Sequence, residues 1–115
     1  VNAGHAPGIL LSADGGMSLI ESNATIVGAF RNAEYGTLEM PLRHGDTLVL
    51  FTDGLPEAKS ADGGIIGSDP FYEMVKKCRA LPVEEMSQAI LDAVNSCSAD
   101  SQGDDDKTIL IAALT

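Results

Sequence analysis

The acidic residues of this chain that could carry chemistry stand beside two apolar runs. Asp53 follows the run 47–52, and three consecutive aspartates, 104–106, precede a second run at 108–114. If these runs are neighbouring antiparallel strands, the end of the first lies beside the start of the second. Carboxylates brought together in this way repel one another unless a cation lies between them, and hard divalent cations prefer oxygen ligands. The spacing therefore predicts a divalent-cation site at one rim of a sheet.

Each of these motifs also has an ordinary structural explanation. An Asp-Gly pair after a strand is usually a turn, and a run of aspartates is usually an exposed loop. A long irregular segment, 53–69, comes after this strand in place of a return strand, which weakens the explanation by a turn. Neither acidic segment has the ligand spacing of an EF-hand. His5 and His44, taken alone, are more often turn or core residues than catalysts.

Composition limits the classes of partner that the chain could bind. It has 115 residues, 44% of them hydrophobic, which is enough for one modest domain with a core. Seventeen acidic residues against seven basic ones give a formal net charge of −10, which disfavours nucleic acid and anionic membrane surfaces. No apolar run approaches the roughly 18 residues of a membrane span, and no signal peptide is recognisable. We therefore expect a cytoplasmic location, with Cys78 and Cys97 as reduced thiols in or near the core.

The elements that must position the acidic residues are mostly strands in the first two thirds of the chain. An apolar run, a turn rich in Gly and Asp and an alternating run predict a hairpin over 7–22. Residues 35–42 alternate, with Leu38 and Met40 on one face, and predict a further strand. The run 47–51 is apolar at nearly every position, which is typical of a strand buried on both faces.

Two helices are predicted between the acidic segments. Ser68 is a candidate cap for the first, and Pro82 stands near the start of the second, which has two glutamates in its first turn. The apolar residues of both fall on one helical face: Phe71, Met74, Val75 and Cys78 in the first, and Met86, Ala89, Ile90, Ala93 and Val94 in the second. Strands, then helices, then a closing strand predict an α+β fold with helices on a largely antiparallel sheet.

Three segments together carry a more specific signal. They are NAGHAP (2–7), LVLFTDGLPEA (48–58) and DDDKTILIA (104–112). In this order and spacing they resemble the C-terminal half of the metal-dependent protein serine/threonine phosphatases, the PPM superfamily. The branch is the bacterial one typified by stage II sporulation protein E and by the phosphatases that regulate stress sigma factors. The resemblance covers nearly the whole chain, and it implies an antiparallel β-sandwich flanked by α-helices, with two Mn²⁺ or Mg²⁺ ions at one rim.

The resemblance also implies roles for individual residues. Asp53 matches the metal-binding aspartate of the family's Thr-Asp-Gly motif. Alignment of the closing motif on Thr108 places a second metal ligand at Asp105 and the neighbouring motif position at Asp106. Asp104 then lies outside the motif, and because three aspartates run together the register could shift by one.

Further positions of the resemblance are expected to support the site rather than to bind metal. Gly54 lets the chain turn sharply away from Asp53. Asn2, Gly4 and His5 match a motif that we interpret mainly as structural support near the site. No protein nucleophile and no catalytic side chain is expected, because a water activated between the two ions would attack the phosphoryl group.

The function that the resemblance implies is hydrolysis of phosphoserine or phosphothreonine on a regulatory protein of the anti-sigma factor antagonist type, in bacterial signal transduction. Residues 1–115 would form the C-terminal portion of the phosphatase domain. The family's upstream Gly-Asp and Gly-His-Gly segment does not occur in the chain, so we expect this polypeptide alone to be inactive. The alternative is a non-catalytic, phosphatase-like module that binds a regulatory partner protein. The upstream gene sequence would discriminate between the two.

Overall fold

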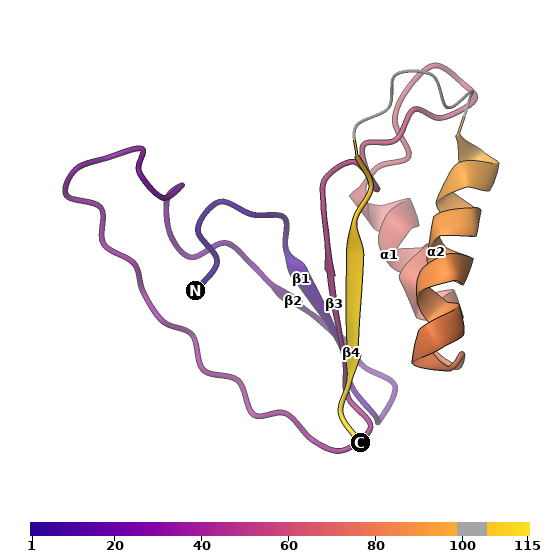
Figure 1. Ribbon diagram of the computed structural model, residues 1–115, viewed down its shortest axis with the longest axis horizontal. Helices are drawn as coiled ribbons and strands as arrows, with labels where there is room; N and C mark the ends of the chain where they lie inside the picture. Colours follow the sequence, from indigo (N-terminus) through magenta and orange to yellow (C-terminus); the bar gives the residue numbers. More distant parts are fainter. Residues whose placement is uncertain (99–105) are drawn as a thin grey trace. The chain divides into compact units, whose positions relative to one another are not determined.

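The computed structural model of the protein describes residues 1–98 and 106–115. Along this part of the chain the elements are β1 (Gly8–Leu11), β2 (Met17–Ile20), β3 (Thr47–Phe51), α1 (Ser68–Cys78), α2 (Val83–Cys97) and β4 (Ile109–Ala113) (Figure 1). The chain divides into two compact units: 1–50 with 112–115, and 51–111. The predicted α+β class, with an antiparallel sheet and two helices, is confirmed.

The strands form one four-stranded sheet of order β2-β1-β3-β4. The predicted hairpin is present, because β1 and β2 are antiparallel with Leu11 opposite Met17. The other side of β1 pairs with β3, also antiparallel, with Ile9 opposite Val49. The hairpin thus brings the first strand of the chain against the strand that leads to Asp53.

The pairing of β3 with β4 is antiparallel, as predicted from the sequence. At one end the Leu114 amide donates to the Asp46 carbonyl over 2.9 Å, and at the other the Thr52 amide donates to the Thr108 carbonyl over 3.0 Å. Residue numbers therefore increase along β3 in the direction in which they decrease along β4. The end of β3 lies beside the start of β4, where the two acidic motifs of the sequence stand.

One five-residue turn occurs twice. The sequence Ser-Ala-Asp-Gly-Gly stands at 12–16, between β1 and β2, and again at 60–64. In the first copy the Gly15 amide donates to the Ser12 carbonyl over 3.0 Å, and the Gly16 amide donates to Asp14 Oδ1 over 3.0 Å. The second copy makes the equivalent bonds at 3.1 and 3.0 Å. The first Gly of each pair has a positive φ, which glycine adopts without steric cost.

The unit 51–111 has its core between the two helices and the end of β3. The buried side chains fall on the predicted helical faces: Phe71, Val75 and Cys78 of α1, and Met86, Ile90 and Val94 of α2. The Phe71 ring lies 4.6 Å from the ring of Phe51, at an interplanar angle of 59°. Within the described residues, no helix is both long and apolar enough to cross a membrane.

The start of α1 differs from the prediction. Ser68 is the first residue of the helix rather than its cap, and the capping position belongs to Gly67, which makes no side-chain capping bond. The Gly67 amide instead donates to the Pro56 carbonyl over 2.8 Å. The loop after Asp53 therefore determines where the helix begins, and Leu55 and Ala58 of this loop are fully or nearly buried.

Two strand predictions were wrong in an informative way. Residues 37–42 form no strand, since none of their backbone groups makes a hydrogen bond with another described residue. The β3 run was expected to be buried on both faces, but Leu50 is 39% exposed while Val49 and Phe51 are buried. In both places the apolar pattern is present, and the neighbour that would bury it is absent from the described residues.

The two cysteines also differ from each other. Both are free thiols, as predicted, but only Cys78 is buried, and burial raises the pKa of its thiol. Cys97 is exposed at the last position of α2, which corrects the expectation that it lies near the core.

Candidate metal centre

Thr52 joins the two strands at the edge where the acidic motifs meet. Its amide donates to the Thr108 carbonyl over 3.0 Å, and its hydroxyl oxygen accepts the Thr108 amide over 3.0 Å. The same hydroxyl donates to the Asp106 carbonyl over 3.2 Å. The Thr52 side chain thus bonds two backbone groups of the facing segment. Thr52 stands directly before Asp53. From the sequence alone Thr52 was only the last residue of an apolar run.

Asp53 is exposed immediately after β3. Its backbone carbonyl accepts the Glu57 amide over 2.9 Å, and the Leu55 amide donates to the Thr52 carbonyl over 3.1 Å. These bonds fold the chain back after the strand, with Gly54 buried inside the turn. The Asp53 carboxylate makes no hydrogen bond or ion pair with any described residue. The backbone is held while the carboxylate stays open to a ligand.

The closing acidic motif is described only from Asp106 onward. Asp106 is exposed, and its carbonyl is the group that the Thr52 hydroxyl binds. Asp105 and Asp104 lie outside the described residues. The structure therefore brings Asp106 to the same edge as Asp53, and the roles predicted for Asp53, Asp105 and Asp106 as ligand or neighbour stay predictions.

The donors at this edge fit a hard cation in kind. Asp53 offers a carboxylate that no other described residue binds, and Asp106 offers a second one on the facing segment. Oxygen donors of this type suit Mn²⁺ or Mg²⁺. In the part of the chain that is described, however, no three His, Cys, Asp or Glu side chains gather closely enough to hold a metal ion. Two carboxylates are fewer than the oxygen ligands that such a cation needs, so further donors are required.

The N-terminal motif closes a loop in the other unit. The Asn2 side chain accepts the His5 amide over 2.9 Å, and the Asn2 carbonyl accepts the amides of Asn23 and Ala24 over 3.0 and 3.1 Å. The Asn2 side-chain amide also donates to the Ala6 carbonyl over 3.3 Å. Asn2 therefore holds the first residues of the chain against the segment that follows β2.

Gly4 and His5 have different parts in this loop. Gly4 has a φ of +81°, and a Cβ there would lie 2.5 Å from Cγ1 of Ile26, so a side chain would collide. Its amide donates to the Ser22 hydroxyl over 2.9 Å. The His5 ring is exposed, with Nδ1 3.0 Å from the Ala6 carbonyl. This geometry supports the structural interpretation of the motif.

Asp46 is a buried carboxylate whose importance the sequence did not reveal. Only 4% of its surface is exposed, and its two oxygens accept the amides of Ala13 and Arg43, each over 2.9 Å. These bonds, first that from Ala13 and then that from Arg43, lower the pKa of Asp46. Residues 44–46, His-Gly-Asp, have the sequence of a turn, and an aspartate just before a buried strand is a common way to bind turn amides.

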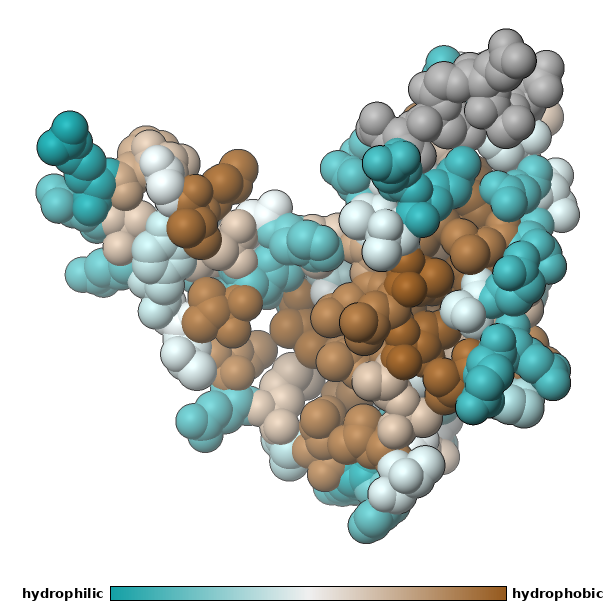
Figure 2. Space-filling view, viewed as in Figure 1, coloured by the Kyte–Doolittle hydropathy of each residue, from teal (hydrophilic) through white to brown (hydrophobic). Residues whose placement is uncertain are grey.

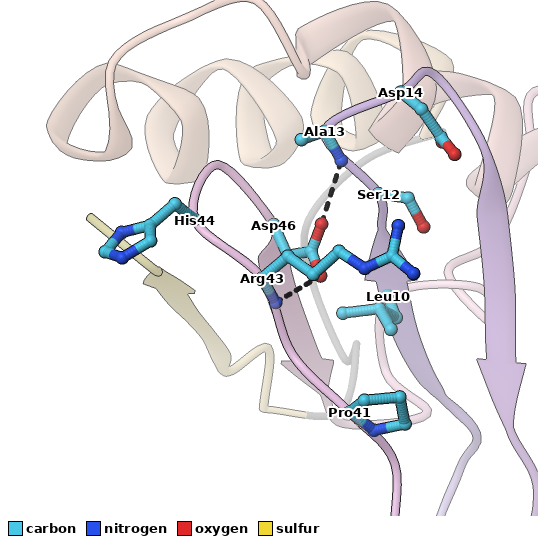
Figure 3. Close-up of a pocket in the computed structure, with 8 residues that line it drawn as sticks. All are labelled: Leu10, Ser12, Ala13, Asp14, Pro41, Arg43, His44 and Asp46. Atoms are coloured by element: carbon cyan, nitrogen blue, oxygen red, sulfur yellow. Dashed lines mark hydrogen bonds between the residues drawn. The ribbon is translucent and has the colours of Figure 1, made fainter.

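A hollow of about 330 Å³ lies beside Asp46, and Figure 3 shows the residues around it. It is lined by Leu10, Ser12, Ala13, Asp14, Pro41, Arg43, His44 and Asp46. Each oxygen of Asp46 already accepts a hydrogen bond from a backbone amide. The bond from Ala13 holds the turn before β3 against the hairpin turn. We therefore do not assign Asp46 to a metal.

Comparison with known proteins identifies the chain as part of a phosphatase domain of the PPM type. The chain belongs to the stage II sporulation protein E (SpoIIE) family, whose family model matches residues 1–115. It is 27% identical over 111 residues to the phosphoserine phosphatase RsbU of Bacillus subtilis (strain 168), a match that covers 96% of this chain and 32% of RsbU. The chain thus spans about a third of the length of this relative.

Two solved structures have the same fold. One is the SiaA-PP2C domain of Pseudomonas aeruginosa, with a TM-score of 0.79 and 24% identity, matched over 95% of this chain and 43% of that one. The other contains the RsbU and RsbW domains of a Mycobacterium tuberculosis protein, with a TM-score of 0.69 and 23% identity, matched over 95% of this chain and 29% of that one. At this level of identity the likeness establishes the fold.

Proposed function

We propose that the chain is the C-terminal portion of a protein phosphatase that hydrolyses phosphoserine or phosphothreonine on a regulatory protein, with Mn²⁺ or Mg²⁺ as cofactor. The observation that carries this proposal is the Thr52 bridge, which joins the residue directly before Asp53 to Asp106 and Thr108. It gains weight because the chain belongs to the SpoIIE family and a curated relative is a phosphoserine phosphatase.

In this proposal Asp53 and Asp105 bind the ions, and Asp106 lies next to them. When bound, the ions would supply the Lewis acidity that polarises the phosphoryl oxygens and activates water. The chain itself supplies negative charge and oxygen donors at a fixed edge, and Thr52 keeps the two acidic segments together. The net charge of −10 then does not oppose a phosphorylated substrate at this edge, because the cations dominate the local field.

The proposed substrate is a phosphorylated regulator of the anti-sigma factor antagonist type. Support comes from the similarity to RsbU and from the solved relative that contains an RsbU and an RsbW domain. The second candidate function is a non-catalytic module that binds such a regulator. The retained Thr-Asp-Gly motif and the aspartates before Thr108 favour the enzyme, because loss of catalysis would not be expected to spare both acidic motifs.

The experiment uses the complete protein as its gene encodes it. Asp53→Asn should abolish metal-dependent hydrolysis of a phosphoserine peptide, because Asn loses the charge and one oxygen donor that a hard cation needs. Initial rates are measured against Mn²⁺ and Mg²⁺ concentration, and a metal-free thermal melt checks that each variant folds. If Asp53→Asn keeps the activity of the parent, or if the parent has no metal-dependent activity, the binding module is the better assignment.

Two further variants serve as matched tests of the closing motif. Asp105→Asn should behave like Asp53→Asn, whereas Asp104→Asn should leave the rates nearly unchanged. The reverse result would move the ligand by one position and leave the phosphatase assignment intact.

A further inference from the structure

One segment of the unit 1–50 has the sequence pattern of a β-strand, but its backbone is not paired with another strand. Residues 37–42, Thr-Leu-Glu-Met-Pro-Leu, place apolar side chains at every second position. This alternation is the pattern of a strand with one buried face. In Figure 1 the segment lies on the long stretch between β2 and β3, which runs as an extended chain with no strand drawn beside it.

The backbone of this segment is unpaired. None of the residues 37–42 donates or accepts a backbone hydrogen bond within the described part of the chain. The segment is tied only at its two ends, where the Asn23 side chain donates to the Gly36 carbonyl over 3.0 Å and the Arg43 amide donates to Asp46 over 2.9 Å. It is therefore held in place at both ends and open between them.

The apolar face of the segment is also largely uncovered, with only Met40 intermediate in exposure. Leu38 is 55% exposed and Leu42 is 47% exposed. Of the eleven exposed large apolar side chains in the described residues, eight belong to the same unit, and they are Val1, Ile26, Val27, Phe30, Tyr35, Leu38, Leu42 and Leu50. Figure 2 shows hydrophobic side chains interspersed with polar ones along this stretch. These exposed side chains include two of the three apolar residues of the segment, so a neighbour that covered the segment would bury them.

A solved structure with this fold has a large part that this chain lacks. The SiaA-PP2C domain matches 95% of this chain, but only 43% of that domain is matched in return. More than half of a domain with this fold therefore has no counterpart here, and part of it must lie against the matched portion for the domain to be compact. A second copy of this chain would offer the same unpaired segment but not the missing part of the fold.

We propose that residues 37–42 form a strand of the complete phosphatase domain that pairs with a strand from the part of the domain outside this chain. Backbone groups of alternate residues point to opposite edges of a strand. The edge formed by residues 37, 39 and 41 lacks the donor at Pro41, which has no amide hydrogen. The pairing edge is the other one, which carries the amides of Leu38, Met40 and Leu42. The proposal rests on the fold of the relative and not on catalysis.

Hydrogen exchange of single amides tests the pairing directly. It is measured on the 115-residue chain and on the complete protein that the gene encodes. We expect the amides of Leu38, Met40 and Leu42 to exchange at least roughly tenfold more slowly in the complete protein, whereas those of Thr37 and Glu39 stay fast. Equal exchange in the two proteins would overturn the proposal. So would slow exchange in the 115-residue chain that appears only on raising its concentration, because the occupant would then be a second copy.

A pair of lysine variants gives a second, independent measurement. Leu38→Lys changes the apolar face and Glu39→Lys changes the opposite one. In the complete protein Leu38→Lys should lower the melting temperature by at least roughly 4 °C relative to Glu39→Lys, and in the 115-residue chain the two should melt together. Equal melting of the two variants in the complete protein would contradict the pairing. Phosphatase rates measured on the same samples test the proposed function separately, since pairing requires no activity.

Discussion

Thr52 and Thr108 exchange two hydrogen bonds across the end of the β3–β4 pair, one through the Thr52 amide and one through its hydroxyl, each 3.0 Å long. A hydroxyl is the smallest side-chain group that can accept one backbone amide and donate to another backbone carbonyl. Valine has nearly the same shape and neither capacity. The edge that carries Asp53 and Asp106 therefore depends on the type of residue at position 52 as well as on the aspartates.

The first prediction concerns this hydroxyl. Thr52→Val should lower the free energy of unfolding by about 0.5–1.5 kcal/mol, the usual net contribution of a hydrogen bond. Thr52→Ser keeps the hydroxyl and should retain most of the stability. Urea denaturation of the three proteins measures the difference. A Thr52→Val protein as stable as the parent would show that the bridge does not hold the strand ends together.

The second prediction concerns the turn before β3. Gly45 has a φ of +88°, and a Cβ there would lie 2.9 Å from the Cβ of Ala13. Gly45→Ala should therefore cost about 1–3 kcal/mol from backbone strain, plus the collision with Ala13. Gly28, with a φ of +84° and nothing within 4 Å of a Cβ, is the matched control for backbone strain alone.

A double variant separates the two parts of this cost. Ala13→Gly removes the methyl group that a new side chain at position 45 would meet, so it should restore part of the stability lost in Gly45→Ala. If Gly45→Ala costs no more than Gly28→Ala, and Ala13→Gly restores nothing, the contact between the two turns is not as close as the structure has it.

The third prediction is a dependence of stability on pH. The lowered pKa of Asp46 means that the folded chain takes up this proton less readily than the unfolded chain. Its contribution to stability is complete above the ordinary carboxyl pKa, roughly pH 4. It is lost as the pH falls from there through the lowered folded value. Asp62 and Glu73 also have lowered pKa values and act in the same direction.

Asp46→Asn should therefore be less stable than the parent at pH 7, because an amide supplies one acceptor where two backbone amides need one each. The gap in melting temperature between parent and variant should narrow as the pH falls below roughly 4. Thermal melts across this range measure the gap. A gap that stays constant to the lowest pH would mean that the Asp46 charge makes no contribution.

The fourth prediction concerns the 115-residue chain as a whole. Exposed apolar residues such as Leu38, Leu42 and Leu50 contribute little to its core. We expect its free energy of unfolding to lie below about 5 kcal/mol, the lower end of the range for whole domains. Equilibrium denaturation with urea measures it. A cooperative, monomeric transition above this value would show that the uncovered residues are not needed for stability.

The sequence predicted well those features that depend on neighbours along the chain. The two copies of Ser-Ala-Asp-Gly-Gly make the same bonds in different units, so the five residues determine the turn by themselves. The helices over 68–78 and 83–97 also follow from local spacing. The residues 37–42 show the limit, because their alternation is local while a strand also needs a partner that the described residues do not supply.

The position of Asp53 and Asp106 at one edge of the sheet was predictable, whereas the residues that support this edge were not. Asp53 and Asp106 stand at the ends of apolar runs, and antiparallel pairing of those runs is enough to bring the ends together. Thr52 bonds the backbone of Asp106 and Thr108, and Asp46 bonds the backbone of Ala13. In both cases the partner lies far away in the sequence. A sequence does not show which distant backbone groups need a partner, so these two residues could be identified only from the structure.

The bridge between Thr52 and Thr108 also affects the order in which contacts can form during synthesis. The two residues are 56 positions apart, whereas α1 and α2 pack against each other from nearly adjacent positions. Contacts that are close in sequence close smaller loops at lower entropic cost, so the helical pair can form while synthesis continues. The acidic edge must wait until Thr108 has left the ribosome. A chain truncated before Thr108 would keep its hairpin and helices but would leave Asp53 without the facing segment.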